Sequence, residues 1–206
     1  LRGFLTESMV GLGVERQLAE RVARRALWIT DDRRPNFRQI NLDWPSSNPG
    51  GYQEWFLSRM RPTQTRALME RAQVDSVPIF RAREPLQRAV QLLKRHRDVM
   101  FADDPDLKPA SILITTIAGR VAQYGENMEQ TLRRALDELR SVRNSGTSQI
   151  PNPINPKENF ADRWTGASCP LRLNFYKWVD AANAAFATYL GESSPQRLLE
   201  VASDDF

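Results

Sequence analysis

The sequence contains almost no cysteine or histidine, and this scarcity excludes several kinds of functional site. One cysteine, Cys169, excludes an internal disulfide and a cysteine-ligated zinc site, and is typical of a reducing compartment. One histidine, His96, excludes a metal centre with two histidine ligands. No stretch approaches the ~20 apolar residues that span a membrane, and the first residues lack the apolar core of a signal peptide. We therefore expect a cytoplasmic protein with no membrane partner.

Motifs of common nucleotide-dependent and hydrolytic enzymes are absent as well. The sequence has neither a Gly-rich phosphate loop of the Walker type nor a Gly-x-Ser-x-Gly elbow. Aspartates occur as direct neighbours, as in Asp103–Asp104, whereas a metal-binding pair on one face of a strand needs alternate positions. Asp104 and Asp106 do alternate, but the surrounding residues predict a turn, where solvated aspartates are common. We therefore predict no catalytic residue and no metal ligand within this chain.

What the chain does contain is the composition of a folded globular protein. Its 206 residues are enough to bury a core, and 41% of them are hydrophobic against 26% charged. The net charge of +4 is compatible with binding nucleotides or nucleic acid, but a charge this small is also usual for a solvated surface. Five tryptophans and nine phenylalanines supply aromatic anchors for the core.

Helical spacing of apolar residues dominates the chain, so we predict a mainly α-helical fold. Helices are predicted at 1–27 (with a break near 11–13), 62–70, 85–101, 126–143 and 171–190. Two further helices are predicted to begin after Asn48 and near Pro109. The run from Ile112 to Ile117 is rich in β-branched residues, but its apolar spacing favours a helix over a buried strand. The remaining segments are predicted as extended chain with at most a short strand at 28–43, an extended connector at 76–83, an irregular loop at 144–155 and a frayed tail after Gly191.

The most informative stretch is the pair of predicted helices on either side of an acidic turn. One stripe of the first helix is apolar except for Arg97, and consists of Leu86, Ala89, Val90, Leu93, Arg97, Met100 and Phe101. Lys94 lies on one shoulder of this stripe. In the turn, Asp106 is a candidate N-cap for the second helix, and Ser111 falls in that helix's first turn. A basic group beside a hydroxyl near a helix N-terminus suits an anion such as a triphosphate.

Both residues also have an ordinary interpretation. A lysine on the shoulder of a buried stripe, such as Lys94, is most often one whose stem covers apolar surface while its ammonium group reaches water. A serine in a first helical turn, such as Ser111, is often there for its capping properties alone. Spacing by itself leaves these alternatives open.

Four stretches together resemble the bacterial CD-NTases, the cGAS/DncV-like nucleotidyltransferases of CBASS anti-phage operons. They are WPSSNPGGYQEWF (44–56), PLQRAVQLLKRHRDVMF (85–101), KPASILITTIAG (108–119) and IPNPINPKENFADRW (150–164). Each is modest alone, but the four occur in the family's order over roughly two thirds of the chain. This resemblance is the strongest functional signal in the sequence.

The resemblance implies a two-part enzyme, of which this chain matches the helical part. A mixed α/β palm carries a Gly-Ser motif and three carboxylates that hold two magnesium ions, and a helical domain closes the other side of the nucleotide cleft. By this comparison, 1–27 are the N-terminal helices, 28–43 a remnant of the palm and connector, and 44–206 the C-terminal helical domain. Most of the palm is missing near Ala26 to Ile29, either because the natural protein is longer or because the gene has lost it. We favour a longer protein, since the junction carries no turn signal.

The same resemblance assigns roles to two residues and a function to the whole protein. Lys94 matches a lysine that contacts the nucleotide triphosphate, and Ser111 matches a serine that also reaches the phosphates. Ile112 stands where some relatives have a base-stacking tyrosine, so this stacking is not expected. The whole protein would be a monomer that joins nucleoside triphosphates, with Mg2+ held by the palm, into a cyclic oligonucleotide that activates a downstream effector. The alternative is a palm-less, non-catalytic helical module that binds a protein or nucleic acid.

Overall fold

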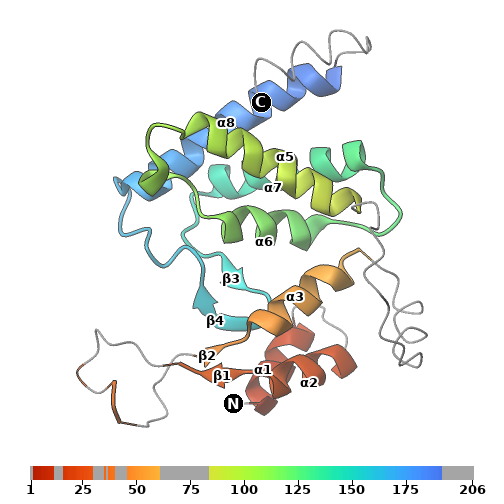
Figure 1. Cartoon of the computed structure of the whole chain (residues 1–206), viewed down its shortest axis with the longest axis vertical. Helices are drawn as coiled ribbons and strands as arrows, with labels where there is room; N and C mark the ends of the chain where they lie inside the picture. The colour runs from red at the N-terminus through yellow and green to blue at the C-terminus, as the bar shows by residue number, and fades with distance from the viewer. Residues whose placement is uncertain are drawn as a thin grey trace. The chain divides into compact units, whose positions relative to one another are not determined.

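A computed structural model describes residues 2–11, 16–29, 35, 37–39, 46–60 and 84–191 (Figure 1). The predicted helix at 62–70, the connector at 76–83 and the tail after Gly191 lie outside the described residues. The fold is mainly α-helical, as predicted. The contacts divide the chain into two compact units, Leu1–Ser58 with Pro151–Asn159, and Arg59–Ile150 with Phe160–Phe206. This division groups residues 44–58 with the N-terminal helices, whereas the boundary based on family resemblance groups them with the C-terminal domain. The two criteria differ, and the family-based boundary stays a prediction.

In its described residues, the first unit has three helices and two short antiparallel ladders. Its helices are α1 (Arg2–Gly11), α2 (Arg16–Arg24) and α3 (Pro49–Ser58), and its strands are β1 (Leu27–Trp28), β2 (Ser46–Ser47), β3 (Pro151–Asn152) and β4 (Asn155–Asn159). In the ladders, β1 pairs with β2 and β3 pairs with β4. The short strand expected within 28–43 therefore exists at Trp28, but it begins one residue earlier, at the last residue of the segment 1–27 that was predicted as helical with one break.

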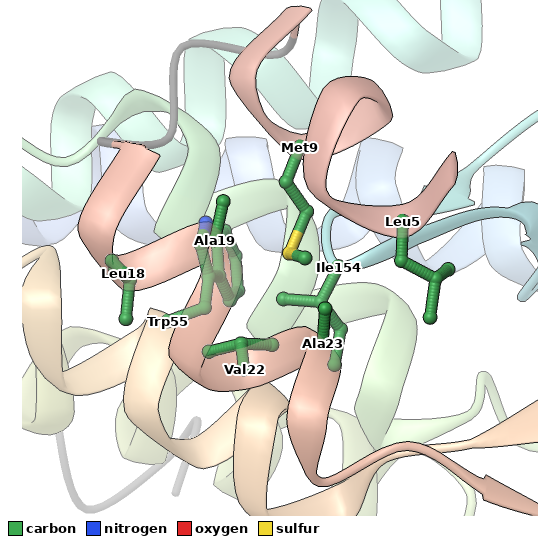
Figure 2. Close-up of a cluster of buried hydrophobic side chains, with 8 residues drawn as sticks. All are labelled: Leu5, Met9, Leu18, Ala19, Val22, Ala23, Trp55 and Ile154. Atoms are coloured by element: carbon green, nitrogen blue, oxygen red, sulfur yellow. The ribbon is translucent and has the colours of Figure 1, made fainter. Parts of the chain in front are cut away.

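The core of this unit is a cluster of eight buried side chains (Figure 2). They come from α1, α2, α3 and the turn between β3 and β4, and are Leu5, Met9, Leu18, Ala19, Val22, Ala23, Trp55 and Ile154. Burying a side chain the size of Leu5 or Ile154 contributes about 1.5–3 kcal/mol to stability. The β3–β4 hairpin, which lies far away in the sequence, is thus fastened to the N-terminal helices by Ile154.

Asn48 starts α3, as predicted, and also fastens it to α2. Its Oδ1 accepts a hydrogen bond from the Gly51 N–H at 2.9 Å, and its carbonyl accepts one from the Tyr52 N–H at 3.0 Å. Its Nδ2 donates to the carbonyl oxygen of Val22 at 2.6 Å. A Cβ atom at Gly51 would lie 2.5 Å from a methyl carbon of Val22, so this close approach of two helices requires glycine.

The second unit is a helical bundle. Figure 1 shows α5 (Pro85–Met100), α6 (Ser111–Val121), α7 (Met128–Ser145) and α8 (Pro170–Gly191), with a short 3-10 helix η1 (Pro105–Leu107) between the first two. Its largest fully buried side chains are Leu93, Leu113, Ile114, Ile117, Leu132, Leu139, Phe175, Trp178 and Phe186, with Ile150 at the hairpin. All four helices lie where periodicity predicted them. The run from Ile112 to Ile117 is helical, which confirms the reading of its apolar spacing over its β-branched composition.

Local hydrogen bonds explain where α7 begins and ends. The Asn127 side chain accepts from the Gln130 N–H at 2.9 Å, and the Gln130 side chain accepts from the Asn127 N–H at 3.0 Å, which is a capping box. At the other end, Gly146 has φ of 63°, a left-handed conformation that glycine adopts without steric cost.

Two sequence-based predictions are wrong in detail. Asp106 is not the N-cap of the helix after the turn, because it lies in η1 and the N-cap of α6 is Ala110. Lys108 precedes a proline and is extended, with φ −68° and ψ 148°, so no helix runs through this point. The segment 144–155 is not wholly irregular, since it contains β3 and the first residue of β4.

Candidate functional site

Lys94 lies on α5 and Ser111 at the start of α6, and Arg97 connects these two helices. Lys94 is half-buried on α5, one helical turn before Arg97. Ser111 is exposed and is the first residue of α6. Arg97 donates a hydrogen bond from Nη1 to the Ser111 hydroxyl oxygen at 2.8 Å. The joint therefore combines a lysine, an arginine and a serine at the start of a helix.

The Arg97 side chain is only 4% exposed, yet its guanidinium group is well supplied with acceptors. Nη1 donates to the Pro109 carbonyl oxygen at 2.9 Å as well as to Ser111. On the other edge, Nε and Nη2 donate to Asp98 Oδ1 at 3.1 Å and 2.7 Å. A buried charge is tolerated when it is paired and hydrogen-bonded in this way.

Asp98 balances part of the positive charge at the joint. Its Oδ1 also accepts from Lys108 Nζ at 3.0 Å, so one carboxylate oxygen serves two basic residues. Burial alone would raise the pKa of Asp98, but the hydrogen bonds from Lys108 and Arg97, together with their charges, outweigh it and lower that pKa below its usual value. Asp98 is consequently ionised at neutral pH.

Lys94 is a cation with no counter-ion in contact. In the part of the chain that the structure describes, its ammonium group makes neither a hydrogen bond nor an ion pair. Burial lowers the pKa of Lys94, the charge of Arg97 lowers it further, and Asp98 opposes the shift. Because the charged form is disfavoured by its surroundings, an added anion at this position would be stabilising.

The start of α6 offers hydrogen-bond donors. The N-cap residue Ala110 has no side chain that could accept from the first N–H groups of the helix, although its carbonyl oxygen accepts from the Leu113 N–H at 3.1 Å. The Ser111 oxygen already accepts a hydrogen bond from Arg97, so its own hydrogen is directed elsewhere. Such a helix N-terminus, with its partial positive charge and free donors, has the chemistry of an anion site.

Two hollows in the second unit lie at the opposite end of α6. One, of about 230 Å³, is lined by Arg59, Glu84 and Tyr124 among others, and the second, of about 460 Å³, by Arg120 and Arg134 among others. Neither hollow includes Lys94 or Ser111. The α5–α6 joint therefore lies outside both of these hollows.

The lone histidine and the lone cysteine are both buried. The His96 ring lies 5.8 Å from the ring of Phe186, against α8. The Cys169 sulfur lies 3.4 Å from the Arg163 carbonyl oxygen, and the Cys169 carbonyl accepts hydrogen bonds at the start of α8. Both residues have packing roles in the second unit.

The described residues form neither a metal site nor a membrane-spanning helix. Among the described residues, no three histidine, cysteine, aspartate or glutamate side chains are grouped so that they could hold a metal ion. The same portion of the chain contains no helix with the length and apolarity needed to cross a membrane.

Comparison with known proteins gives relatives of one kind. The chain is 33% identical over 132 residues to a c-di-GMP synthase of Roseivirga ehrenbergii, a match over 61% of this chain and 35% of that protein. It is 32% identical over 83 residues to the cyclic dinucleotide synthase CdnG of Bradyrhizobium diazoefficiens, over 37% of this chain and 20% of CdnG. No family model matches the chain.

A solved structure shares the fold. It is the Bradyrhizobium diazoefficiens CD-NTase CdnG in complex with GTP, which matches with a TM-score of 0.57 and 22% identity over 77% of this chain and 52% of that chain. The chain is thus similar in sequence to two cyclic dinucleotide synthases and in fold to a CD-NTase. It spans about a third and a fifth of the lengths of the two synthases, and about half of the solved CD-NTase. The similarity therefore concerns one part of a CD-NTase.

Sequence reasoning identified Lys94 and Ser111 but assigned no role to Arg97, the residue that joins their helices. The available signal was its position, because Arg97 is the one charged residue in an otherwise apolar stripe. A buried arginine requires acceptors, and these come from residues 12 and 14 positions further along the chain. Their identity could not be read from the helical period.

Proposed function

We propose that the full-length protein containing this chain joins nucleoside triphosphates into a cyclic oligonucleotide, and that this chain supplies the helical side of the nucleotide cleft. The names of the two synthases and the GTP bound to the solved CD-NTase support this proposal. Because the chain spans only part of each relative, the activity is proposed for the longer protein.

Lys94 and Ser111 would hold the triphosphate of one nucleotide. The observation that carries this role is the half-buried Lys94, which has no counter-ion among the residues that the structure describes. It lies one turn from an arginine that contacts the start of α6, where the N-cap residue makes no side-chain cap hydrogen bond. A triphosphate supplies the missing negative charge, and its oxygens accept from the ammonium group, the Ser111 hydroxyl and the first N–H groups of α6. Holding the departing phosphates would also stabilise the charge that develops on them during transfer.

Magnesium has no ligand set among the described residues, since no suitable group of side chains exists there. These residues do not fit a metal site, and we assign them no step that depends on one. In the proposed enzyme, the catalytic carboxylates and Mg2+ belong to a palm that this chain lacks and that the longer protein would supply.

The biological role rests on family resemblance alone. We propose that the product is a second messenger that activates a downstream effector in anti-phage defence, and that the protein acts as a monomer in the cytoplasm.

The proposal is tested with purified full-length protein, ATP, GTP and Mg2+, with products analysed by mass spectrometry. We expect a cyclic oligonucleotide, and a large loss of product with Lys94→Met and with Ser111→Ala. Arg88→Met, which removes an exposed arginine nine residues before Arg97 and therefore on the other side of α5, is the matched control. Absence of cyclic product from every nucleotide mixture would contradict the enzyme, and an intact mass near 23.6 kDa for the native protein would favour the palm-less module.

A further inference from the structure

We propose that Arg97 is a positioning residue for triphosphate binding, which acts through Ser111 by holding its hydroxyl group as a hydrogen-bond donor to phosphate. The inference rests on the proposed function, because it concerns the same ligand. It assigns a role to a buried side chain that does not itself touch the ligand.

The contacts of Arg97 surround the start of α6. Nη1 donates to the carbonyl of Pro109 and to the hydroxyl of Ser111, the residues immediately before and after the N-cap Ala110. One nitrogen atom of α5 is therefore bonded to the two residues that flank the N-cap of α6. The orientation of the donors at this helix start depends on that link.

The guanidinium group of Arg97 is itself held in place by other residues. Its other edge is bound to Asp98, which also accepts from Lys108. A guanidinium group is planar, so the bonds on the Asp98 edge determine where Nη1 points. The resulting arrangement occupies four of the five guanidinium hydrogens, and the side chain is 4% exposed. Arg97 is thus poorly suited to bind a phosphate directly.

The hydrogen bond between Arg97 and Ser111 has a fixed direction. A guanidinium group can only donate, so the Ser111 oxygen must accept and its hydrogen must point away from Arg97. Serine hydroxyls in helices otherwise turn toward nearby backbone carbonyls, which would remove the donor from the ligand. Arg97 keeps the hydroxyl available beside the first N–H groups of α6, where a phosphate oxygen would accept from them together.

The test is a double-mutant cycle with Arg97→Lys and Ser111→Ala in the full-length protein. Lysine keeps the positive charge but lacks the planar fork, so any loss reports geometry rather than net charge. The affinity for GTP is measured by calorimetry in EDTA, so that no turnover occurs, and urea titration shows that each variant is folded. Arg88→Met serves as the exposed control on the same helix.

We expect about a tenfold loss of GTP affinity for each single variant, and nearly the same tenfold loss for the double variant, because both remove one donor. Losses that multiply to about a hundredfold would mean that Arg97 acts independently of Ser111, and would overturn the inference while leaving the proposed function in place. An unchanged affinity in Arg97→Lys would also overturn it. If wild-type protein binds neither GTP nor ATP, the proposed function fails, and the inference fails with it.

A measurement on the wild-type protein covers the case in which the Arg97 variant does not fold. Side-chain nitrogen resonances of Arg97 and Lys94 are followed by NMR as inorganic tripolyphosphate is added. We expect the Lys94 ammonium signal to shift and the Arg97 Nε signal to stay nearly unchanged, since its partners are retained. An Arg97 shift as large as that of Lys94 would mean direct contact with the ligand and would overturn the positioning role.

Discussion

An arginine holds each end of α6, but the two arginines stand in opposite electrostatic surroundings. At the C-terminal end, Arg59 donates to the carbonyl oxygens of Gly119 at 2.9 Å, Arg120 at 3.3 Å and Ala122 at 3.0 Å. These carbonyls would otherwise lack partners within the helix, and their end of the helix carries partial negative charge. The Arg59 contact is therefore favourable and complete in itself.

At the N-terminal end of α6, the arginine is Arg97, and its positive charge meets the positive end of the helix dipole. The start of α6 carries partial positive charge, so Arg97 adds a like charge, and Lys94 adds another nearby. Asp98 is ionised and offsets part of this charge, but it is shared with Lys108. The two ends show that the same residue type can lie in opposite surroundings: Arg59 meets the negative end of α6 and Arg97 the positive end, where the proposed anion would supply further negative charge.

The largest effect should follow removal of the buried arginine. We expect Arg97→Met to lower the free energy of unfolding of the second unit by about 3 kcal/mol. The substitution leaves the Pro109 carbonyl without its hydrogen bond from Arg97 and removes the partly buried Arg97–Asp98 ion pair. Urea titration followed by the fluorescence of the buried Trp178 measures this change. Arg88→Met, from an exposed position, should change it by no more than about 0.5 kcal/mol. A loss equally small in Arg97→Met would remove the claim that the joint depends on this side chain.

Lys94→Met should lower the affinity for GTP without lowering stability, the reverse of what we expect for a purely structural residue. We expect the affinity for GTP to fall by about 2 kcal/mol, since a charge-assisted contact to phosphate is lost. The stability of the free protein should stay the same or rise, because a half-buried ammonium group without a partner is replaced by an apolar chain of similar length. Calorimetric titration with GTP and urea unfolding of the same samples separate the two effects. A variant that loses stability and keeps its affinity would indicate that Lys94 is an ordinary structural lysine.

Arg59→Met should affect stability only. The variant leaves three backbone carbonyls at the end of α6 to water, and we expect a loss of about 1.5 kcal/mol in the free energy of unfolding. The affinity for GTP should remain within twofold of the wild-type value, since Arg59 lies at the other end of the helix. A large loss of affinity would show that both ends of α6 contribute to the ligand site, and the contrast between them would no longer hold.

The smallest effect is a shift in pH dependence. Burial lowers the pKa of Lys94 below 10.5, the value of an ordinary lysine. As the pH rises, Lys94 should therefore lose its charge, and GTP binding should weaken, at a lower pH than for an ordinary lysine. The folded protein binds fewer protons than the unfolded chain between the lowered pKa and 10.5, so in the same window Lys94 makes stability rise with pH. Lys94→Arg, whose charge persists, should move the alkaline loss of binding to higher pH. Identical pH profiles for the two proteins would exclude Lys94 as the titrating group.

The helices themselves were largely predictable. Apolar residues at a spacing of three and four positions located α5, α6, α7 and α8, and Asn48 marked the start of α3. Errors arose where a structure depends on distant partners. The β3–β4 hairpin was missed because its strands are short and polar, and it is fastened through Ile154 to helices that precede it by more than a hundred residues.

The sequence by itself determined where the helices lie and that Lys94 and Ser111 flank one turn, because the helical period is a local property of neighbouring residues. Only the tertiary structure decided that Arg97 is buried, which carbonyl and hydroxyl groups it binds, and that no other described residue pairs with Lys94. Hydrogen-bond partners depend on which oxygens the packed backbone brings within about 3 Å of a donor, and that distance is set when the helices pack against each other.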